Sequence, residues 1–562
     1  MQPLLKVRGI CHVSESPSCT LMRGFRILGC FPKTQVRSSS LHSVVMSRDY
    51  KAAISALNSL QSNFAIVKEF NKPETRHALN LRSLPETVEW LRRIGYQPSD
   101  LNRLNPIHVA GTKGKGSTSS FISSILYQYT PSQSSSPRFN KVGLYTSPHL
   151  RFARERIRIN NEPLSEEQFA QYFFEVWDRL DDAARAAGED PNNLQTKPQY
   201  FRYLTLMAFH TYLSEGVDAA VIECGIGGEY DCTNVIEQPA ATAITSLGID
   251  HVALLGNTIE EIAWHKGGII KANTKAFSAP QPPSAEKVLR ERAANKHTEL
   301  EFVSSHPDLK KHGDIKLGLA GDFQYGNAAL AVATAGEVLR KVGKLDITAG
   351  FREQPLPAEF RKGLEQAQLE GRCQTRKEEN VTWYIDGGHT QESIKLAGQW
   401  FASQIKADSS SEASAAKKLR VLIFNQQTRD SNALAQSLHE TLETALGSKT
   451  PFTHAIFCTN VTYKETGYRP DLVSMNQDGA AVEKLQVQKA LAEKWNSIDP
   501  SAEVNVFATI EEAIDFTRDL ASREENRIEG DEAPIMTFVT GSLHLVGGVL
   551  DVIETKPYSK KL

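Results

Sequence analysis

The sequence is poor in cysteine, and no two cysteines are close enough to suggest a metal or disulfide motif. Its 562 residues include seven cysteines, an odd number, and none of them has C-x-x-C spacing with another. Disulfide-stapled domains are much richer in cysteine, and many structural zinc sites begin with such a pair. The distribution fits a reducing compartment and argues against both a disulfide framework and a zinc site.

Two further absences argue against membrane-spanning proteins and proteins that coat nucleic acid. No apolar run approaches the roughly 20 residues that a transmembrane helix needs. The 64 Lys and Arg residues balance 66 Asp and Glu residues, and the net charge is -2, whereas nucleic-acid-coating proteins carry a basic excess. The composition, 40% apolar and 23% charged, is that of a globular protein. At roughly 100–200 residues per domain, the length predicts two or more domains.

The first 45 residues differ from the rest of the chain. They hold six basic residues and one acidic residue, Glu15, and they are rich in serine. This composition is typical of a mitochondrial transit peptide. Met46 follows directly, and an ordinary mixture of charges begins at Asp49. We therefore expect a mitochondrial form that starts at Met1 and a cytoplasmic form that starts at Met46; a basic tail without an address is the alternative.

Two series of short apolar strands, separated by amphipathic segments, predict an α/β protein. The first series lies at residues 107–110, 142–146, 219–223 and 242–247, and the second at 382–385, 420–424, 455–458, 504–507 and 535–539. Strands that alternate with helices are typical of βαβ units and of a mainly parallel sheet. We expect one domain over residues 46–365 and a smaller α/β domain over 366–562, with the boundary near Pro355 and Pro357.

The strongest candidate site is the glycine-rich stretch GTKGKGS at residues 111–117, between a predicted strand and a predicted helix. Backbone N–H groups at a helix N-terminus favour phosphate groups, and Lys115 adds a positive charge. The match to the common P-loop pattern is imperfect, because Gly116 stands between Lys115 and Ser117. A glycine-rich turn with an exposed lysine is the alternative. We predict a phosphate site.

Polar residues follow other predicted strands as well. Glu223 closes one strand before a glycine-rich loop, and His251 follows the next, while DGGH at 386–389 and TGSLH at 540–544 follow strands of the second series. Ligands of open α/β sheets bind beyond the carboxyl ends of the strands, where a carboxylate can ligate a hard cation such as Mg²⁺. A solvated acid, a structural histidine and simple glycine turns are the alternatives, and each signal is weak by itself.

Together these motifs resemble those of the folylpolyglutamate synthases, in the same order and with similar spacing. The matching segments are GTKGKGS, YTSPHL at 145–150, RERIRIN at 154–160, ECGIGGEYDCTN at 223–234, DHVALLG at 250–256, HKGGIIK at 265–271, DGGHT at 386–390 and TGSLHLVGG at 540–548. The resemblance covers most of the chain and is to the eukaryotic members of this Mur-type ligase family. It implies an N-terminal P-loop ATPase domain with a mainly parallel sheet, a smaller Rossmann-like C-terminal α/β domain, and an active site between them.

The resemblance also implies roles for individual residues. ATP would be bound by Gly111, Thr112, Lys113, Gly114, Lys115, Gly116, Ser117, Arg372 and Asp386. Mg²⁺ would be bound by Ser147, Glu223 and His251, and a monovalent cation such as K⁺ is a further expected cofactor. The catalytic residues would be Lys115, Lys266 and His389, with Lys266 at the position that family members carbamylate. L-Glutamate would be bound by His389 and Ser542. Gly268 and Gly388 stand where the family commonly has alanine, and we expect these small changes to be tolerated.

The implied activity is an ATP-dependent ligase that adds L-glutamate to the γ-carboxylate of tetrahydrofolates. Because a carboxylate is a poor electrophile, ATP would first convert it to an acyl phosphate. The expected partners are ATP, reduced folates and L-glutamate, with no nucleic acid, no integral membrane segment and a monomeric state. One alternative is dihydrofolate synthase, whose loop tends toward GLGGRLDATN where this chain has GIGGEYDCTN. Another is an inactive folate- or nucleotide-binding paralogue, against which the complete set of candidate residues argues.

Overall fold

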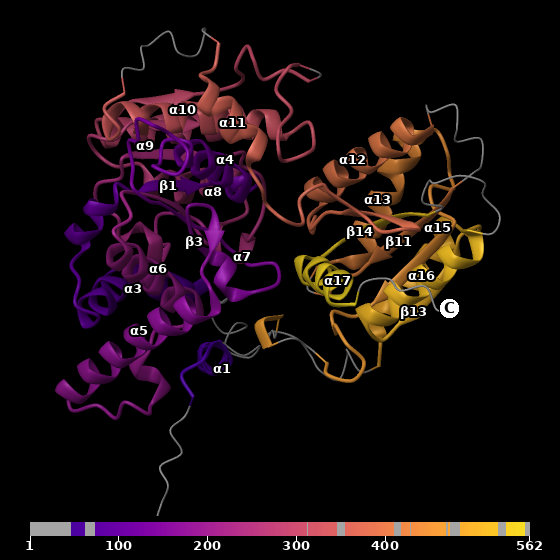
Figure 1. Cartoon of the computed structure of the whole chain (residues 1–562), viewed down its shortest axis with the longest axis horizontal. Coiled ribbons are helices and arrows are strands. Elements are labelled where there is room, and N and C mark those ends of the chain that lie inside the picture. Colours follow the sequence, from indigo (N-terminus) through magenta and orange to yellow (C-terminus); the bar gives the residue numbers. More distant parts are fainter. Residues whose placement is uncertain are drawn as a thin grey trace, which may run out of the picture. The chain divides into compact units, whose positions relative to one another are not determined.

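Two β-sheets, each covered by helices, make up the described part of the chain (Figure 1). The computed structural model describes residues 47–61, 73–311, 313–345, 355–409, 418–427, 429–467, 470–472, 484–525 and 535–556. The predicted leader, residues 1–45, lies outside the described residues.

The N-terminal sheet has the strand order β4-β3-β2-β5-β1-β6-β7-β8. Its strands are β1 (Ile107–Ala110), β2 (Val142–Tyr145), β3 (Ile157–Ile159), β4 (Glu162–Pro163), β5 (Ala219–Glu223), β6 (Ala241–Ile244), β7 (Ala276–Ser278) and β8 (Leu300–Phe302). Neighbouring strands from β2 through β8 run parallel, and β3 and β4 add an antiparallel edge.

Helices cover both faces of this sheet because its central strands are buried on both sides. They are α1 (Tyr50–Ser59), α3 (Pro73–Arg93), α4 (Lys115–Tyr127), α5 (Glu166–Ala186), α6 (Tyr200–Glu215), α7 (Val252–Leu255), α8 (Ile259–Lys266), α9 (Pro283–Asn295), α10 (Gln324–Lys341) and α11 (Ala358–Gln366). In β5, Val221 packs with α4 and α10, whereas Ala220 and Ile222 pack with α5 and α6. This alternation follows from the two-residue period of a strand.

The C-terminal sheet repeats the pattern with the strand order β13-β12-β11-β14-β10-β9. Its elements are β9 (Gln374–Lys377), β10 (Val381–Ile385), α12 (Gln391–Ser409), β11 (Leu419–Phe424), α13 (Ser431–Leu446), β12 (His454–Cys458), α15 (Gln486–Ile498), β13 (Glu503–Phe507), α16 (Ile510–Glu525), β14 (Ile535–Thr540) and α17 (Leu543–Thr555). In β11, Leu422 and Phe424 face the core under α12 and α13, and Val421 and Ile423 face the core under α16 and α17. Only β9 pairs antiparallel among these described strands.

The predicted α/β class with mainly parallel sheets is confirmed, and every predicted strand exists. The predicted strand at 242–247 ends three residues early, at Ile244, so that the following residues form a loop. Strands β3, β4, β7, β8 and β9 were not predicted; each has two to four residues and lies at or near a sheet edge. The predicted domain limits stay a prediction. Helix α11 packs on α4 of the first sheet, and the first strand of the second sheet, β9, begins at Gln374.

The topology places loops from several strands at one edge of the N-terminal sheet. Strand β1 lies between β5 and β6, and the chain leaves it through α4 to reach β2 beyond β5. Such a reversal of strand order opens a crevice at the carboxyl ends of the strands, where ligands of open α/β sheets bind. The loops after β1, β2, β5 and β6 all leave from this edge.

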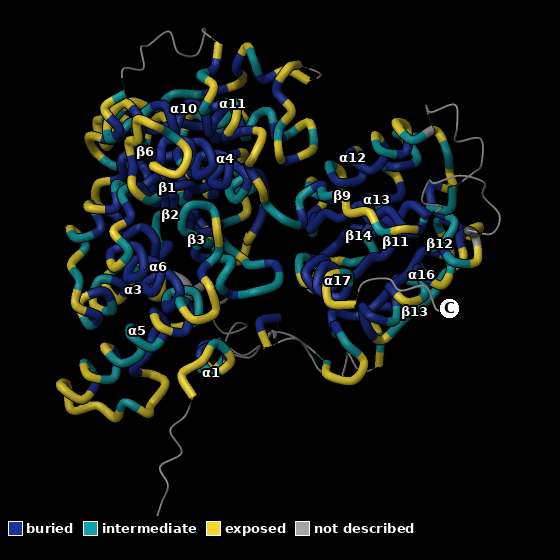
Figure 2. Tube along the Cα trace, viewed as in Figure 1, coloured by how far each residue is buried: buried dark blue, intermediate teal, exposed yellow. Residues whose placement is uncertain are grey.

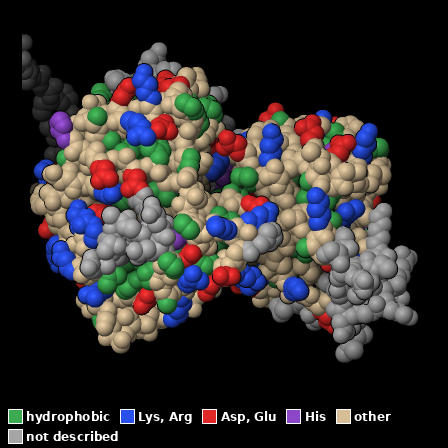
Figure 3. Space-filling view, turned by 90° about the horizontal axis from the view of Figure 1, so that it is seen from above, with side chains coloured by type: hydrophobic (Ala, Val, Ile, Leu, Met, Phe, Trp, Pro, Cys, Tyr) green, Lys and Arg blue, Asp and Glu red, His purple; other side chains and the backbone are tan. Residues whose placement is uncertain are grey.

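The surface carries charges of both signs, and the hydrophobic core lies along the two sheets. Strands of both sheets are buried, whereas many helices expose their outer side (Figure 2). On the face shown in Figure 3, Lys and Arg side chains alternate with Asp and Glu side chains. Among the described residues, no helix has the length and apolar character needed to cross a membrane.

Candidate active site

One cavity collects most of the predicted site residues. It has a volume of about 2070 Å³ and is lined by residues from the loops of both sheets. The predicted residues on its wall are Thr112, Lys113, Gly114, Lys115, Gly116, Ser117, Ser147, Glu223, His251, Arg372, Asp386 and His389. Gly111, Lys266 and Ser542 do not line it.

The loop after β1 takes a shape that needs glycine at two positions. Gly111 has φ of 148°, and an added Cβ would lie 1.8 Å from Thr245 Oγ1. Gly114 has φ of 87°, and an added Cβ would lie 2.3 Å from Asn327 Oδ1. Residues other than glycine rarely adopt such backbone conformations. Glycine at these two positions therefore allows this loop to lie close to the loop after β6 and to α10.

Helix α4 begins at Lys115 and presents its N-terminus to the cavity. Gly114 precedes it, and no side chain caps the helix. Residues 114–117 line the cavity wall. Uncapped N–H groups and the positive end of the helix dipole together make an anion site. The predicted phosphate loop thus has the local structure that phosphate binding requires.

The two lysines of this loop differ in their partners. Lys113 forms an ion pair with Asp250 at 3.0 Å, and Arg429 pairs with the same carboxylate at 2.9 Å. Burial alone would raise the pKa of Asp250, but Lys113, His251 and Arg429 together lower it. Lys115 forms no ion pair with any carboxylate of the described residues. Lys115 is therefore the cation that a bound anion would meet.

Glu223 is a buried carboxylate beside this loop. It ends β5, is 3% exposed, and its Oε2 accepts a hydrogen bond of 2.9 Å from the Ser147 N–H. Burial raises its pKa, and Lys115 and Arg156 are among the charges that oppose this rise. An added Cβ at Gly116 would lie 3.7 Å from Oε2, so the carboxylate adjoins the phosphate loop. Nearby positive charge favours the ionised form of a carboxylate and so acts against the effect of burial.

The predicted magnesium ligands have suitable chemistry. Glu223 and the Ser147 hydroxyl supply oxygen, the ligand type that Mg²⁺ prefers. His251 caps α7 in the left-handed conformation, with φ of 51°. Desolvation lowers the pKa of His251 to about 4, so the ring is neutral and can ligate a metal. The described residues hold no cluster of three or more His, Cys, Asp or Glu side chains that could bind a metal, and the predicted set contains only two residues of those types.

Lys266 lies beneath the phosphate loop instead of on the cavity wall. It ends α8, is 3% exposed, and its Nζ donates a hydrogen bond of 2.7 Å to the Gly111 carbonyl. Burial, with help from the charge of Lys115, lowers the pKa of Lys266 to about 7. A substantial neutral fraction of this amine is therefore present at neutral pH, which makes it nucleophilic.

The glycine-rich loop after β5 is fastened to the end of α8. The Glu229 N–H donates to the His265 carbonyl at 2.7 Å, and Asn234 Nδ2 donates to the Gly268 carbonyl at 3.2 Å. A Cβ at Gly268 would lie 2.4 Å from the Glu229 Cα. An alanine at Gly268 would therefore require the backbone to move in this chain, although the family resemblance suggested a tolerated position.

The second sheet contributes residues from the ends of β10 and β14. Asp386 accepts hydrogen bonds from the backbone N–H groups of Cys373 and Gly388, at 2.9 and 2.8 Å, so it shapes the loop that follows β10. His389 Nδ1 lies 2.9 Å from the Gly387 carbonyl and must carry the proton, which leaves Nε2 as an acceptor. Burial lowers the pKa of His389 to about 4.

Arg372 lines the cavity, whereas Ser542 does not. The Ser542 hydroxyl caps α17 by accepting from the His544 N–H at 3.2 Å, and Ser542 is absent from the cavity wall. Arg372 lines the wall, and its Nη1 donates to the Gly371 carbonyl at 3.1 Å. The cap role of Ser542 was not predicted from the sequence.

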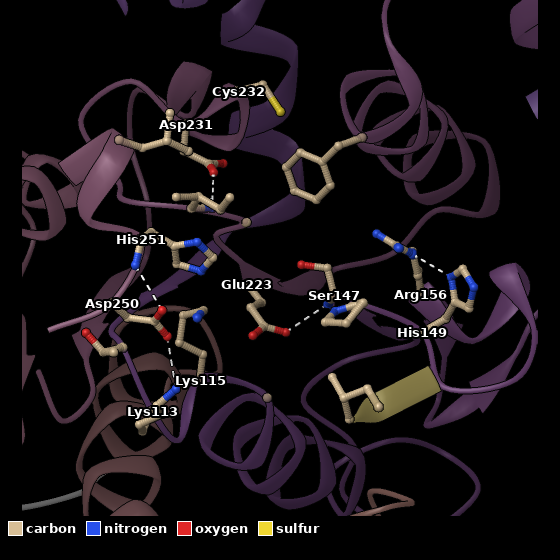
Figure 4. Close-up of a pocket in the computed structure, with 18 of the residues that line it drawn as sticks. Lys113, Lys115, Ser147, His149, Arg156, Glu223, Asp231, Cys232, Asp250 and His251 are labelled. Atoms are coloured by element: carbon tan, nitrogen blue, oxygen red, sulfur yellow. Dashed lines mark hydrogen bonds and ion pairs between the residues drawn. The ribbon is translucent and has the colours of Figure 1, made fainter. Parts of the chain in front are cut away.

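Three cavity residues were not given roles by the sequence, although all three lie in matching motifs. Arg156 and His149 are joined by a hydrogen bond of 2.9 Å and lie beside Ser147 (Figure 4). His544 lines the same cavity. The matching motifs contain these positions, but their spacing in the sequence does not indicate that His149 and Arg156 form a hydrogen bond.

Comparisons with known proteins place the chain in a family. No protein-family model matches the chain. It is 45% identical over 514 residues to a folylpolyglutamate synthase of Saccharomyces cerevisiae, covering 91% of this chain and 88% of the relative. The chain belongs to the folylpolyglutamate synthase family.

Solved structures of the family share the fold. A Mycobacterium tuberculosis folylpolyglutamate synthase complexed with ADP and AMPPCP matches with a TM-score of 0.62 and 21% identity, over 91% of this chain and 100% of that chain. The Thermotoga maritima folylpolyglutamate synthase matches with a TM-score of 0.56 and 23% identity, over 86% and 99% of the two chains. At these identities the likeness concerns the fold.

Lys266 should make stability depend on pH. Its folded-state pKa, about 7, lies below the unfolded value of 10.5, so burial of the ammonium costs stability below about pH 7 and this cost disappears as pH rises. We expect the unfolding free energy of the wild type to rise relative to that of Lys266→Met between pH 7 and 9.5, by ~1 kcal/mol per pH unit. Denaturant titrations in CO₂-free buffer measure this difference. Parallel pH profiles for the two proteins would contradict the burial of a titrating amine.

Proposed function

We propose that the protein is an ADP-forming ligase that joins L-glutamate to the γ-carboxylate of tetrahydrofolates. The observation that carries this is the buried carboxylate of Glu223 next to an uncapped helix N-terminus and to Lys115, which forms no ion pair with the described residues. Family membership supports the same reaction. A folylpolyglutamate synthase of the same fold has been solved with AMPPCP and folate.

The reaction has two steps, both of which need concentrated positive charge. A γ-carboxylate oxygen of the folate attacks the γ-phosphorus of ATP, the bond to the bridging oxygen breaks, and ADP leaves. The glutamate nitrogen then attacks the acyl carbon, phosphate leaves with the oxygen that came from the carboxylate, and the nitrogen loses a proton. Fixed donors and cations in a dry site stabilise the charge that develops in such steps.

The chain's own residues have distinct tasks in this scheme. The N–H groups of residues 114–117 and the Lys115 ammonium hold the transferred phosphoryl group. Arg372 and Asp386 bind ATP from the second sheet. His389 orients the amine of the incoming glutamate by accepting a hydrogen bond at Nε2, and Ser542 caps the start of α17.

Glu223, Ser147 and His251 would hold Mg²⁺. When bound, the ion neutralises phosphate charge and orients the phosphoryl group. Glu223 is suited to this role because the described residues donate to only one of its oxygens, Oε2 from the Ser147 N–H, which leaves Oε1 available. The resemblance also suggests K⁺, for which we assign no residues.

Lys266 is proposed to carry a carbamate. Its neutral amine would add to CO₂, forming an N–C bond and releasing one proton, and the product is an anion. The buried position and the lowered pKa of about 7 favour the neutral, nucleophilic amine. The alternative is an unmodified ammonium that keeps its hydrogen bond to Gly111 and supports the phosphate loop.

A direct assay tests the proposed function. Purified protein should incorporate labelled L-glutamate into tetrahydrofolate only when ATP is present. Turnover of dihydropteroate in place of tetrahydrofolate would favour dihydrofolate synthase, and turnover of neither substrate would favour an inactive paralogue. Gel filtration beside the assay tests the proposed monomer.

Lys115→Ala should abolish turnover while the protein stays folded. Lys115 makes no ion pair within the described chain, so its loss should cost little stability, but the developing phosphate charge would lose a partner. We expect kcat to fall about 100-fold or more. Lys296→Ala, which removes an exposed lysine outside the cavity, is the matched control. Wild-type turnover in Lys115→Ala would show that the loop is not the phosphate site.

Chemical rescue separates the two proposed states of Lys266. If the residue is a carbamate, Lys266→Ala should be inactive and should recover some activity with short-chain carboxylic acids, which can occupy the vacated anionic position. Lys115→Ala should show no such recovery, because an acid cannot replace a cation. Rescue of Lys266→Ala by small amines and not by acids would instead support the unmodified ammonium.

The leader is proposed to set the location of the protein. A reporter fused to residues 1–45 should enter mitochondria, because the segment is basic, rich in serine and poor in acids. The same reporter fused to the chain from Met46 should stay in the cytoplasm. Fluorescence microscopy of both fusions measures this, and identical distributions would reject two start sites.

A further inference from the structure

Arg156 is a buried cation that has no carboxylate partner among the described residues. It ends the short helix η2 (Ala153–Arg156), is 8% exposed, and lines the cavity. Its Nε donates to His149 Nδ1 at 2.9 Å, and its guanidinium lies 5.5 Å from the centre of the Tyr200 ring. It forms no ion pair with the described residues, and its two terminal nitrogens make no hydrogen bond with them.

A buried guanidinium of this kind needs an anion. Arginine stays protonated in proteins, so burial cannot be relieved by loss of the proton. An unpaired buried charge is costly, and such a cost is retained where a ligand offsets it. Burial raises the pKa of Glu223, and the charges of Lys115, Arg372 and Arg156 act against this rise. Three cations therefore lie near this one carboxylate. Lys115 and Arg372 already have proposed partners on ATP, and Arg156 has none.

The neighbours of Arg156 fix its orientation. His149 Nδ1 accepts from Arg156, so the ring proton is on Nε2, which donates to the Asp471 carbonyl at 2.9 Å. The Glu155 carboxylate accepts the N–H groups of residues 150–152, at 2.9 to 3.1 Å, and so holds the loop that carries His149. With Nε fixed in this way, the terminal fork of the guanidinium is the part left for a ligand.

The position of Arg156 favours an anion other than the nucleotide phosphates. In Figure 4, Lys115 and Arg156 lie on opposite sides of Glu223 and Ser147. Burial, and then the charge of Arg156, lower the pKa of His544, which lies in the first turn of α17, so the two residues are near each other. Arg156 therefore belongs to the part of the cavity beyond the phosphate loop. The remaining substrates of the proposed reaction, a folate and L-glutamate, are both carboxylates.

We propose that the Arg156 guanidinium binds a substrate carboxylate through its terminal fork, and that His149 is the positioning residue that orients it. The proposal rests on the proposed ligase function. The planar fork matches a carboxylate in two parallel hydrogen bonds, which lysine cannot reproduce. The carboxylate belongs either to the incoming glutamate or to the folate, and the two sources are distinguishable by kinetics.

The test compares Arg156→Gln, Arg156→Lys and the wild type in steady-state assays that vary one substrate at a time. Arg156→Gln should raise the KM of one carboxylate substrate roughly 10- to 100-fold, the loss expected for charge-assisted hydrogen bonds. Arg156→Lys should recover only part of this loss. Binding of AMPPCP, measured by calorimetry, should stay within about twofold of wild type. Arg158→Gln, in the same motif but off the cavity wall, is the control.

Substrate amides identify the carboxylate. If Arg156 binds the glutamate α-carboxylate, the wild type should discriminate strongly against the α-amide of L-glutamate, and Arg156→Gln should lose most of that discrimination. A raised KM for tetrahydrofolate alone would assign the folate carboxylate instead. Unchanged KM values for both substrates in an otherwise active enzyme would overturn the proposal, as would weakened AMPPCP binding. An inactive wild type would instead reject the ligase function itself.

His149→Gln tests the positioning role. Glutamine can still accept from Arg156 through its amide oxygen, so we expect a smaller rise in the same KM than for Arg156→Gln. His149→Leu, which cannot accept that bond, should approach the Arg156→Gln value while the melting temperature stays near wild type. A kcat loss in His149→Leu without any change in KM would contradict a positioning role exerted through Arg156.

Discussion

The site depends on one buried carboxylate and the positive charge gathered around it. Glu223 is placed at the end of β5, in the middle of the N-terminal sheet, where it is shielded from water and held by the Ser147 N–H. Burial alone would favour its neutral form, and the surrounding cations oppose this. The phosphate loop, the loop after β2 and the second sheet each bring one of those cations. The cations placed around Glu223 are suited to binding anionic substrates.

The same constraint explains how the surrounding loops are built. Glycine at 111 and 114 lets the phosphate loop approach the loop after β6 and helix α10. Lys266 supports that loop from below through the Gly111 carbonyl, and the loop after β5 is fastened to the end of α8. Asp250 holds Lys113 to Arg429, which leaves Lys115 for the ligand. Both lysines of this motif line the cavity, but among the described residues only Lys113 forms an ion pair with a carboxylate.

Sequence patterns predicted the buried strands and the loops at their ends, because both follow from local rules of burial and turn chemistry. For that reason they indicated Glu223 and the loop at residues 111–117 as candidate site residues. They missed β7, which has only three residues, and β9, whose residues QTRK include no apolar side chain. They could not separate Lys113 from Lys115, or reveal that Arg156 meets His149, because these depend on contacts between distant loops. They also gave no sign that the Ser542 side chain caps α17, and its predicted contact with L-glutamate stays a prediction.

The central claim is that this concentration of charge activates a carboxylate by phosphorylation. Tetrahydrofolate carrying ¹⁸O in its γ-carboxylate tests this directly in a reaction with ATP and L-glutamate. If an acyl phosphate forms, each phosphate released should contain one ¹⁸O atom from the carboxylate, as mass spectrometry of the phosphate would show. Phosphate without ¹⁸O, released while glutamate is incorporated, would contradict the account.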